Sequence, residues 1–193
     1  MKKRQLVLDI GGVLATDLDN FWFTLSEEAQ LPLEIVRSVY KQEIRQNLWN
    51  GNITEPEFWD WLTNTFPNIK LDYLKESLTN SLYPLDGINY LKRWANHADI
   101  HILSNHRAEW IYPFLNPFKH FLSSIIISSE VGVAKPDKEI YEICMNQIGG
   151  NLPILFVDNK SENLIPASDF GWNTILADSS NQWINTVENE IVR

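Results

Sequence analysis

LVLDIGGVLATD (residues 6–17) is the stretch of sequence that decides the fold. Three apolar residues lead to a carboxylate, Asp9, and the chain then passes through two glycines, Gly11 and Gly12. A short apolar run of this kind is typical of a buried strand, and glycine favours a sharp turn directly after it. The pattern therefore predicts a central strand that presents a carboxylate at its end.

Four further apolar runs resemble the first and have strand character. With the first, they are QLVLD (5–9), DIHILS (99–104), SSIIIS (123–128), PILFVD (153–158) and NTILA (173–177). Most are nearly continuous in apolar residues, which suits parallel strands that are covered on both faces. Helical patterns separate the later runs, so the sequence predicts an α/β fold, a doubly wound parallel sheet.

Three helices are expected between these strands, over residues 86–97, 136–148 and 161–170. In each segment the apolar residues recur at helical spacing. Gly171 follows the third segment and is a suitable C-terminal cap. Pro166 lies inside that segment, and it is expected to be tolerated only in a first helical turn.

The segment between the first two strands is too long for one crossover connection. Residues 15–84 contain helical patterns and no convincing strand, so we expect a helical cap inserted between two parts of one α/β core, residues 1–14 and 85–193. Pro32 suits a first helical turn, and Thr54-Glu55-Pro56-Glu57 matches a capping box.

Half of the eight tryptophans lie in this predicted cap, at positions 22, 49, 59 and 61. Packing within the cap is the expected role for most of them, and the alternative is that one or two line a substrate pocket.

Composition limits the classes of partner. The 193 residues carry a net charge of -9, which argues against nucleic acid and against an anionic membrane surface. No apolar stretch approaches the length of a membrane span, and Asp9 interrupts the N-terminal apolar run before it could serve as a signal peptide. The single cysteine, Cys144, is expected in the core. We expect a cytoplasmic protein, monomer or homodimer.

The strand ends carry polar residues that would meet at one edge of the sheet. Asp9, Ser104-Asn105 and Asp158 end three of the runs, and Lys135 follows another in VGVAKPD. This set suits phosphoryl transfer, in which Asp9 attacks phosphorus and forms an aspartyl-phosphate. Mg²⁺ held by Asp9 and Asp158 would neutralise the approach of two anions.

The remaining groups of the set would hold the phosphoryl oxygens of the substrate. Lys135, the Ser104 hydroxyl and the backbone N–H groups of the turn at Gly11 and Gly12 are the candidates, with Asn105 beside them. Each residue alone is weak evidence, because aspartate often caps a helix and lysine is usually solvated. The ordered combination carries the prediction.

Four motifs resemble those of the haloacid dehalogenase (HAD) superfamily, in which phosphatases predominate. They are DIGGVL (9–14), ILSNH (102–106), GVAKPDKEIY (132–141) and LFVDNKSENL (155–164). The length between the first two matches a helical C1-type cap, and the motifs resemble the sugar-phosphatase and epoxide-hydrolase-N-domain-like branch. The resemblance implies Asp9 as nucleophile, Ser104 and Lys135 as stabilisers of phosphate or nucleophile, and Asp158 and the Gly11 carbonyl as metal ligands.

Two positions depart from that pattern. Phosphatases of this superfamily usually carry an acid/base aspartate two residues after the nucleophile, where this chain has Gly11, and this predicts slow turnover. Asp17 and Asp19 are possible surrogates, although surface helix caps are the simpler interpretation of both. Asn159 replaces a second acidic residue, which predicts weaker metal binding, with Glu162 as a possible outer partner.

Three functions remain open. The first is a Mg²⁺-dependent phosphatase acting on a small phosphorylated metabolite such as a sugar phosphate. The second is a non-catalytic protein that binds a phosphorylated ligand or a partner, and the third is a 2-haloacid dehalogenase in which Asp9 attacks carbon. None of the four histidines has metal-ligand spacing, and only His106, directly after the second motif, is a candidate site residue.

Overall fold

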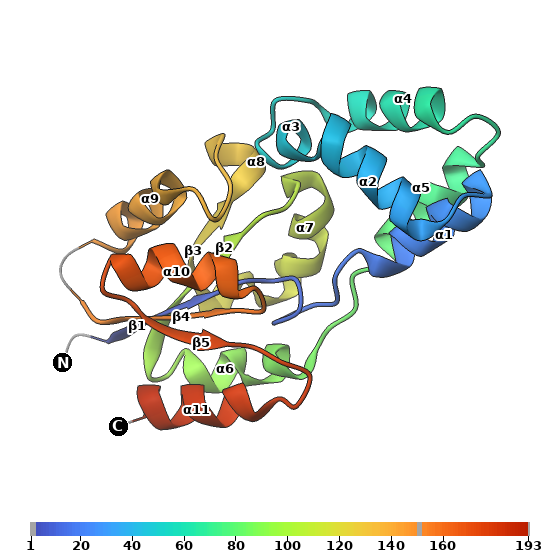
Figure 1. Cartoon of the computed structure of the whole chain (residues 1–193). Coiled ribbons are helices and arrows are strands. Elements are labelled where there is room, and N and C mark those ends of the chain that lie inside the picture. Colours follow the sequence, from blue (N-terminus) through green and yellow to red (C-terminus); the bar gives the residue numbers. More distant parts are fainter. Residues whose placement is uncertain (1–2, 150–151, 193) are drawn as a thin grey trace.

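A five-stranded parallel sheet forms the centre of the computed structural model, which describes residues 3–149 and 152–192 (Figure 1). The strand order is β3-β2-β1-β4-β5, which places the first strand in the middle. The strands are β1 (Arg4–Leu8), β2 (Ala98–Ser104), β3 (Leu122–Ile127), β4 (Ile154–Asp158) and β5 (Asn173–Leu176). All five predicted strands are confirmed, to within one residue at each end.

Both faces of the sheet are covered, as the continuous apolar runs predict. Leu6 and Leu8 point to one face, where they join a cluster with Trp94 and Trp183. Val7, between them in sequence, joins the opposite cluster with Tyr141. This alternation is the two-residue period of a strand, and it buries β1 from Gln5 to Leu8, whereas Arg4 is exposed.

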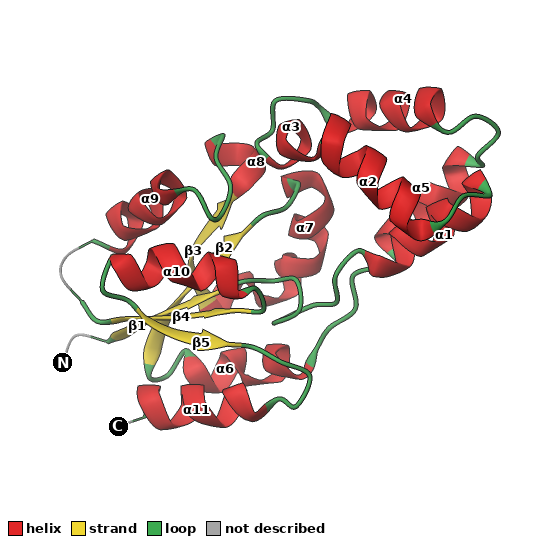
Figure 2. Ribbon diagram, in the orientation of Figure 1, coloured by secondary structure: helices red, strands yellow, loops and turns green. Residues whose placement is uncertain are grey.

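Eight helical elements surround the sheet (Figure 2). They are η1 (Asp86–Tyr90), α6 (Leu91–Trp94), α7 (Ala108–Leu115), η2 (Asn116–Phe121), α8 (Ser128–Val131), α9 (Lys138–Ile148), α10 (Ser161–Asp169) and α11 (Gln182–Ile191). Buried side chains of α6 and α11, with Ile111 and Leu115 of α7, belong to one core cluster, and buried side chains of α9 and α10 belong to the other. The architecture is thus the predicted α/β sandwich.

Two of the expected helices differ in detail. The segment 86–97 divides into a 3-10 helix and the short helix α6, which ends at Trp94. Gly87 lies so close to the Trp183 ring and the Val13 carbonyl that a Cβ there would clash, and this close packing favours the tighter helix. The segment 136–148 becomes helical only at Lys138 because its N-cap residue is extended.

The third expected helix corrects the interpretation of Pro166. This residue lies in the second turn of α10, buried against the sheet, and not in the first turn. The helix continues past it with only the N–H of that one residue missing from its ladder. Gly171 takes the left-handed conformation (φ 78°) directly after the helix, as predicted.

Five helices lie between β1 and η1, and we refer to them as the inserted helices. They are α1 (Asp19–Ala29), α2 (Leu33–Glu43), α3 (Arg45–Trp49), α4 (Glu55–Thr65) and α5 (Leu71–Thr79). Figure 1 shows them beyond the carboxyl ends of the strands, as a group with its own apolar cluster. Pro32 is the N-cap of α2 and not part of its first turn, and the Thr54–Glu57 capping box is present.

The inserted helices are tied to the core by α7. The indole of Trp110 packs into the apolar cluster of the inserted helices and donates to Glu55 (2.9 Å). The same carboxylate accepts a hydrogen bond from Trp59 (3.1 Å). Arg107, which is almost completely buried, donates to the carbonyl of Ile53 (2.5 Å). These contacts place the inserted helices over the sheet edge at which strands β1, β2 and β4 end.

Several smaller predictions also have an outcome. Cys144 is buried in the core. His101 is buried in β2, where its ring nitrogens contact Ser124 and Gln5. Across the described ranges 3–149 and 152–192, no helix has the length and apolar character needed to cross a membrane.

Candidate active site

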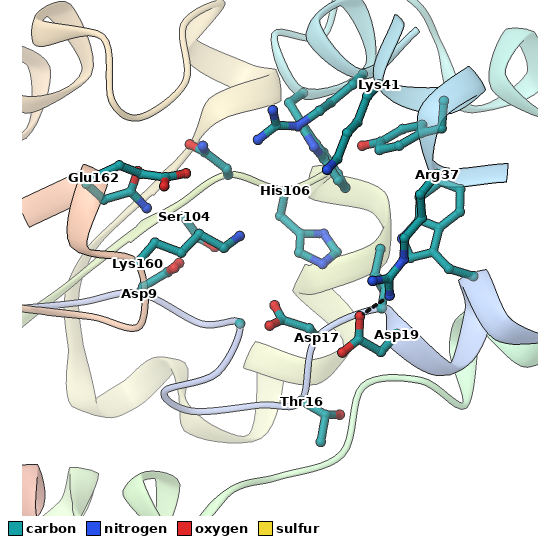
Figure 3. A pocket seen from close by; sticks show the side chains of 18 residues that line it. Asp9, Thr16, Asp17, Asp19, Arg37, Lys41, Ser104, His106, Lys160 and Glu162 are labelled. Atoms are coloured by element: carbon teal, nitrogen blue, oxygen red, sulfur yellow. Dashed lines mark hydrogen bonds and ion pairs between the residues drawn. The ribbon is translucent and has the colours of Figure 1, made fainter. Parts of the chain in front are cut away.

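A cavity of about 410 Å³ lies between the sheet edge and the inserted helices (Figure 3). The loops after β1, β2 and β4 form one side of this cavity, and helices α1, α2 and α3 form the other. Its size lies in the range of roughly 300–1,000 Å³ that is typical of small-molecule pockets. The cavity is therefore at the sheet edge where the sequence predicts the site.

Asp9 lies on the sheet side of this cavity, directly after the central strand. Its backbone N–H continues the ladder to β4 by donating to Val157 (3.0 Å). One carboxylate oxygen, Oδ1, accepts from the N–H of Ile10 (2.7 Å) and is 3.1 Å from the ammonium of Lys135. Asp9 is only 6% exposed, so its carboxylate is held in one place with little contact with bulk water.

Lys135 is completely buried behind Asp9. Its ammonium donates to the carbonyl of Leu103 (2.8 Å) and to Asp158 (2.6 Å), and it pairs with Asp9. An ammonium has three donors, and all three are used. Burial alone would lower the pKa of Lys135, but the two carboxylates together raise it, so the group is cationic. The Lys135 ammonium is therefore better placed to hold the Asp9 carboxylate than to make the predicted contact with phosphoryl oxygens.

Asp158 is also completely buried, at the end of β4. Its oxygens accept from Lys135, from the N–H of Lys160 (2.8 Å) and from the side-chain amide of Asn163 (3.0 Å to each oxygen). Burial raises the pKa of the Asp158 carboxyl, and Lys135 opposes this rise. Both oxygens are thus engaged by protein donors, and the predicted direct contact of Asp158 with a metal would have to displace some of them.

Ser104 ends β2, Asn105 follows it, and both line the cavity. Ser104 is 1% exposed, and its strand pairs with β1, the strand that leads to Asp9. The side-chain amide of Asn105 forms two hydrogen bonds with the backbone of Lys135, donating to its carbonyl (2.7 Å) and accepting from its N–H (2.8 Å). Asn105 therefore positions the loop that carries the lysine, a role that the prediction of substrate binding did not include.

Gly12 differs from its predicted role. Its N–H donates to the Ala15 carbonyl (2.7 Å), so it is not free to bind a phosphoryl oxygen. Its backbone is left-handed (φ 71°), and a Cβ there would lie 2.1 Å from the amide nitrogen of Asn159. Gly12 is required by the close approach of these two loops.

Gly11 leaves room for another carboxylate. A Cβ built on Gly11 would lie only 2.3 Å from Oδ1 of Asp17. Asp17 lines the cavity and accepts a long hydrogen bond (3.4 Å) from the Asn159 amide. It does not cap α1, whose N-cap is Leu18 without a side-chain bond, so the simpler interpretation of Asp17 as a helix cap is wrong. The carboxyl group occupies the place of the side chain that Gly11 lacks.

Asp17 faces the cavity, and its surroundings raise the pKa of its carboxyl. Crowding by protein atoms raises the pKa of its carboxyl, and the nearby ammonium of Lys160 partly offsets this rise. His106 also lines the cavity, and its ring is tilted against that of Trp49 with 5.6 Å between ring centroids. Burial lowers the pKa of His106 to about 4, so its ring is neutral at pH 7.

The residues around Asp9 fit a hard divalent cation that keeps water ligands. In the part of the chain that the structure describes, no three His, Cys, Asp or Glu side chains are grouped as a metal site. However, the carbonyl oxygen of the Asn159 side chain is buried without a hydrogen-bond partner within those same ranges. Oxygen atoms of this kind are ligands that Mg²⁺ accepts, together with a carboxylate, a backbone carbonyl and water. Asp9, the Gly11 carbonyl and Asn159, which lines a second cavity with Gly12 and Asp17, are the candidate oxygen donors in the loops after β1 and β4.

The helical side of the cavity was not predicted. Arg37, Lys41 and Arg45 line it, together with the aromatic side chains of Trp22 and Tyr40. The cations recur every four residues in RSVYKQEIR (37–45), which places them on one side of a helix, and this spacing is visible in the sequence. Their direction toward the site is not, because it depends on how α2 packs.

Trp49 lines the cavity beside Trp22, whereas Trp59 and Trp61 pack within the inserted helices. Two of the four tryptophans therefore line the cavity, in agreement with the alternative that one or two do so and not with the expectation that most serve only to pack the cap.

Comparison with known proteins gives structural neighbours but no sequence match. No family model matches the chain, and no curated protein matches it. A HAD family enzyme from Bacteroides thetaiotaomicron has a TM-score of 0.82 at 19% identity, covering 96% of this chain and 98% of its own. A predicted HAD-like family hydrolase from Porphyromonas gingivalis has a TM-score of 0.82 at 18% identity, with complete coverage of both chains.

Dehalogenases are found among the neighbours as well. One has a TM-score of 0.66 at 23% identity, covering 93% of this chain and 86% of its own. At these identities the comparisons establish architecture: a parallel sheet flanked by helices, with inserted helices over its carboxyl edge. The chain therefore has the fold of the HAD-family hydrolases.

Proposed function

We propose that this chain is a Mg²⁺-dependent hydrolase of phosphoric monoesters that acts on a small phosphorylated metabolite. The observation that carries the proposal is the fixed carboxylate of Asp9, which Ile10 and Lys135 orient on the sheet side of a polar cavity. Structures of the Bacteroides thetaiotaomicron enzyme contain magnesium and inorganic phosphate, which supports the same chemistry here.

Asp9 is the nucleophile in this mechanism. Its carboxylate attacks phosphorus, the bond to the ester oxygen breaks, and the phosphoryl group is carried as an aspartyl-phosphate. Lys135 keeps the attacking carboxylate in place and balances its charge, and Asn105 fixes the loop that bears the lysine. The Ser104 hydroxyl, at the end of the strand that pairs with β1, donates to a phosphoryl oxygen. Mg²⁺, held by Asp9, the Gly11 carbonyl and Asn159, supplies charge neutralisation when bound.

Asp17 is the proton-transfer group in this mechanism. Its carboxyl lies where a side chain on Gly11 would project, so it can protonate the departing ester oxygen. In the second half of the reaction it accepts a proton from the water that attacks the aspartyl-phosphate, and inorganic phosphate is released. Its raised pKa favours the protonated form needed for the first of these steps.

The inserted helices act as a cap in this proposal. They close one side of the cavity, so a bound substrate is surrounded by α1, α2 and α3 and by the sheet edge. Exclusion of bulk water strengthens the electrostatic contacts of the site.

The proposal is tested by phosphate release from a panel of phosphate monoesters with and without Mg²⁺. Hydrolysis is expected with the wild type, and both Asp9→Asn and chelation by EDTA are expected to abolish it. Asn159→Asp should lower the Mg²⁺ concentration needed for half-maximal rate, because a charged oxygen ligand replaces a neutral one. Calorimetric titration with Mg²⁺ measures the same change without turnover.

Other outcomes would contradict the proposal. Absence of phosphate release across the panel, together with formation of a beryllofluoride complex on Asp9, would indicate a non-catalytic phospho-ligand-binding protein. Chloride release from 2-chloropropionate without metal would indicate a dehalogenase.

A further inference from the structure

Three basic side chains form what we call the cationic wall of the cavity: Arg37, Lys41 and Arg45. The first two lie one turn apart on α2, and the third begins α3. Figure 3 shows the Lys41 side chain pointing into the cavity from the helical side, which lies opposite the loop that bears Asp9. The wall therefore faces the reacting group across the cavity.

The wall carries positive charge that the protein leaves unbalanced. Arg37 pairs with Asp19, which also lines the cavity. In the described ranges, neither Lys41 nor Arg45 forms an ion pair with a carboxylate of the chain. Two free cations thus border a cavity in a protein whose net charge is -9. The positive charge of the wall is opposite in sign to the net charge of the protein, and such a local excess of cations attracts an anionic ligand.

Two buried polar atoms beside the wall also have no partner. They are Nε of Arg37 and the hydroxyl of Tyr40, within the described part of the chain. Tyr40 is 6% exposed and lines the cavity. Buried polar groups are normally satisfied, so an unsatisfied pair at a cavity wall indicates a ligand that supplies the partner. The Trp22 ring is tilted against the Tyr40 ring (4.2 Å between centroids, 39° between planes) and adds an apolar surface next to it.

The reacting phosphoryl group does not need this wall. In the proposed mechanism that group is bound on the sheet side by Asp9, Ser104 and the cation, whereas the wall belongs to the inserted helices. Resting on the proposed function, we infer that the substrate is a phosphate monoester with a second anionic group, a carboxylate or a second phosphate. Arg37, Lys41 and Arg45 bind that second group, and the connecting part of the substrate lies against Trp22 and Tyr40.

The inference is tested with three substrates whose leaving groups are all primary alkoxides: an ω-hydroxyalkyl phosphate, the ω-carboxyalkyl phosphate of equal length and the matching alkanediol bisphosphate. The wild type with Mg²⁺ is expected to show a kcat/KM about tenfold higher for one or both of the doubly anionic esters, which is one well-formed charged contact. The doubly anionic ester with the larger increase in kcat/KM identifies the second group as a carboxylate or as a phosphate.

Variants assign the preference to the wall. Lys41→Met and Arg45→Met should each reduce the ratio of kcat/KM between anionic and neutral substrates. Lys70→Met is the matched control, because it removes a positive charge from an exposed site on the inserted helices outside the cavity. This control should keep both the basal rate and the ratio of the wild type.

Equal kcat/KM values for all three esters, or an unchanged ratio in both wall variants, would overturn the inference while leaving the phosphatase proposal intact. If no ester is hydrolysed, the phosphatase proposal fails, and the inference is decided by calorimetric binding of the same esters to Asp9→Asn. Stronger binding of a doubly anionic ester supports the wall, and equal binding of all three overturns it.

Discussion

Glycine at position 11 and aspartate at position 17 form one unit at the scale of single residues. Position 11, two residues after Asp9, has no side chain, and the carboxyl of Asp17, six residues later, occupies the space that a side chain there would take. Gly11 does not require a left-handed backbone, so its small size matters because of the neighbouring carboxyl. The expectation of slow turnover applies if no group replaces the missing acid, and in the proposed mechanism Asp17 is that group.

The proposed proton-transfer role of Asp17 is tested by moving its carboxyl to position 11. Asp17→Gly is expected to lower kcat for an alkyl phosphate by about a hundredfold or more, because the departing alkoxide loses its proton donor. Gly11→Asp in that background should restore part of the rate, whereas Gly11→Asp alone should not raise it, since its Cβ collides with Asp17. Steady-state kinetics of the four proteins measure the cycle.

The leaving group supplies the control for this cycle. Loss of rate in Asp17→Gly should be much smaller with p-nitrophenyl phosphate, whose phenolate departs without protonation. An equal loss with both esters would assign Asp17 a structural role, and no loss would remove it from the mechanism.

Among the secondary-structure elements, α4 supports the packing of the inserted helices. Phe58, Trp59 and Leu62 of α4 are buried in the apolar cluster of this group. The helix begins with a reciprocal cap, in which the Thr54 hydroxyl accepts from the Glu57 N–H and the Glu57 carboxylate accepts from the Thr54 N–H (2.6 Å). The cap satisfies backbone donors that the helix cannot satisfy itself.

Removal of this cap gives the prediction for the element. Thr54→Ala is expected to lower the free energy of unfolding by about 1 kcal/mol, and Thr54→Ser should retain most of it because serine keeps the hydroxyl. Urea unfolding followed by circular dichroism measures both. Equal stability of Thr54→Ala and the wild type would show that the cap contributes nothing in this context.

At the scale of the whole molecule, we expect the free energy of unfolding to depend on pH because His106 is buried in its neutral form. The unfolded chain protonates His106 below about pH 6.5, whereas the folded protein does so only near pH 4, because burial lowers its pKa. The unfolded state therefore binds more protons in this window, and stability falls as the pH drops from 6.5 to 4. The loss from this one group amounts to about 3 kcal/mol at pH 4.

His106→Asn isolates that contribution. Asparagine can accept the hydrogen bond that Arg107 N–H donates to the ring nitrogen (3.0 Å), but it does not titrate. The difference in free energy of unfolding between pH 7 and pH 4 should be about 3 kcal/mol smaller in the variant. Urea titrations at both pH values decide it, and equal differences in the two proteins would contradict the assignment.

Much of this architecture was predictable from local sequence. Continuous apolar runs identify all five strands because both faces of a parallel sheet are buried, and the motif order places Asp9, Ser104 and Asp158 at one edge. Two details were not predictable, the 3-10 helix that contains Gly87 and the buried Pro166, because both depend on what packs against the helix.

What the sequence determined by itself is the α/β class, the central strand and the identity of a carboxylate at its end. Only the tertiary structure decided that the Lys135 ammonium contacts Asp9 and Asp158 and that Asp17 fills the space beside Gly11. It also decided that the cationic wall, Arg37, Lys41 and Arg45, lines the cavity. The physical reason is range. Strand burial and helix periodicity are encoded within a few residues. The contacts of Lys135 and of the cationic wall exist only once distant segments have packed together. The position of Asp17, although only six residues from Gly11, depends on the conformation of the loop after β1 and on its contact with Asn159.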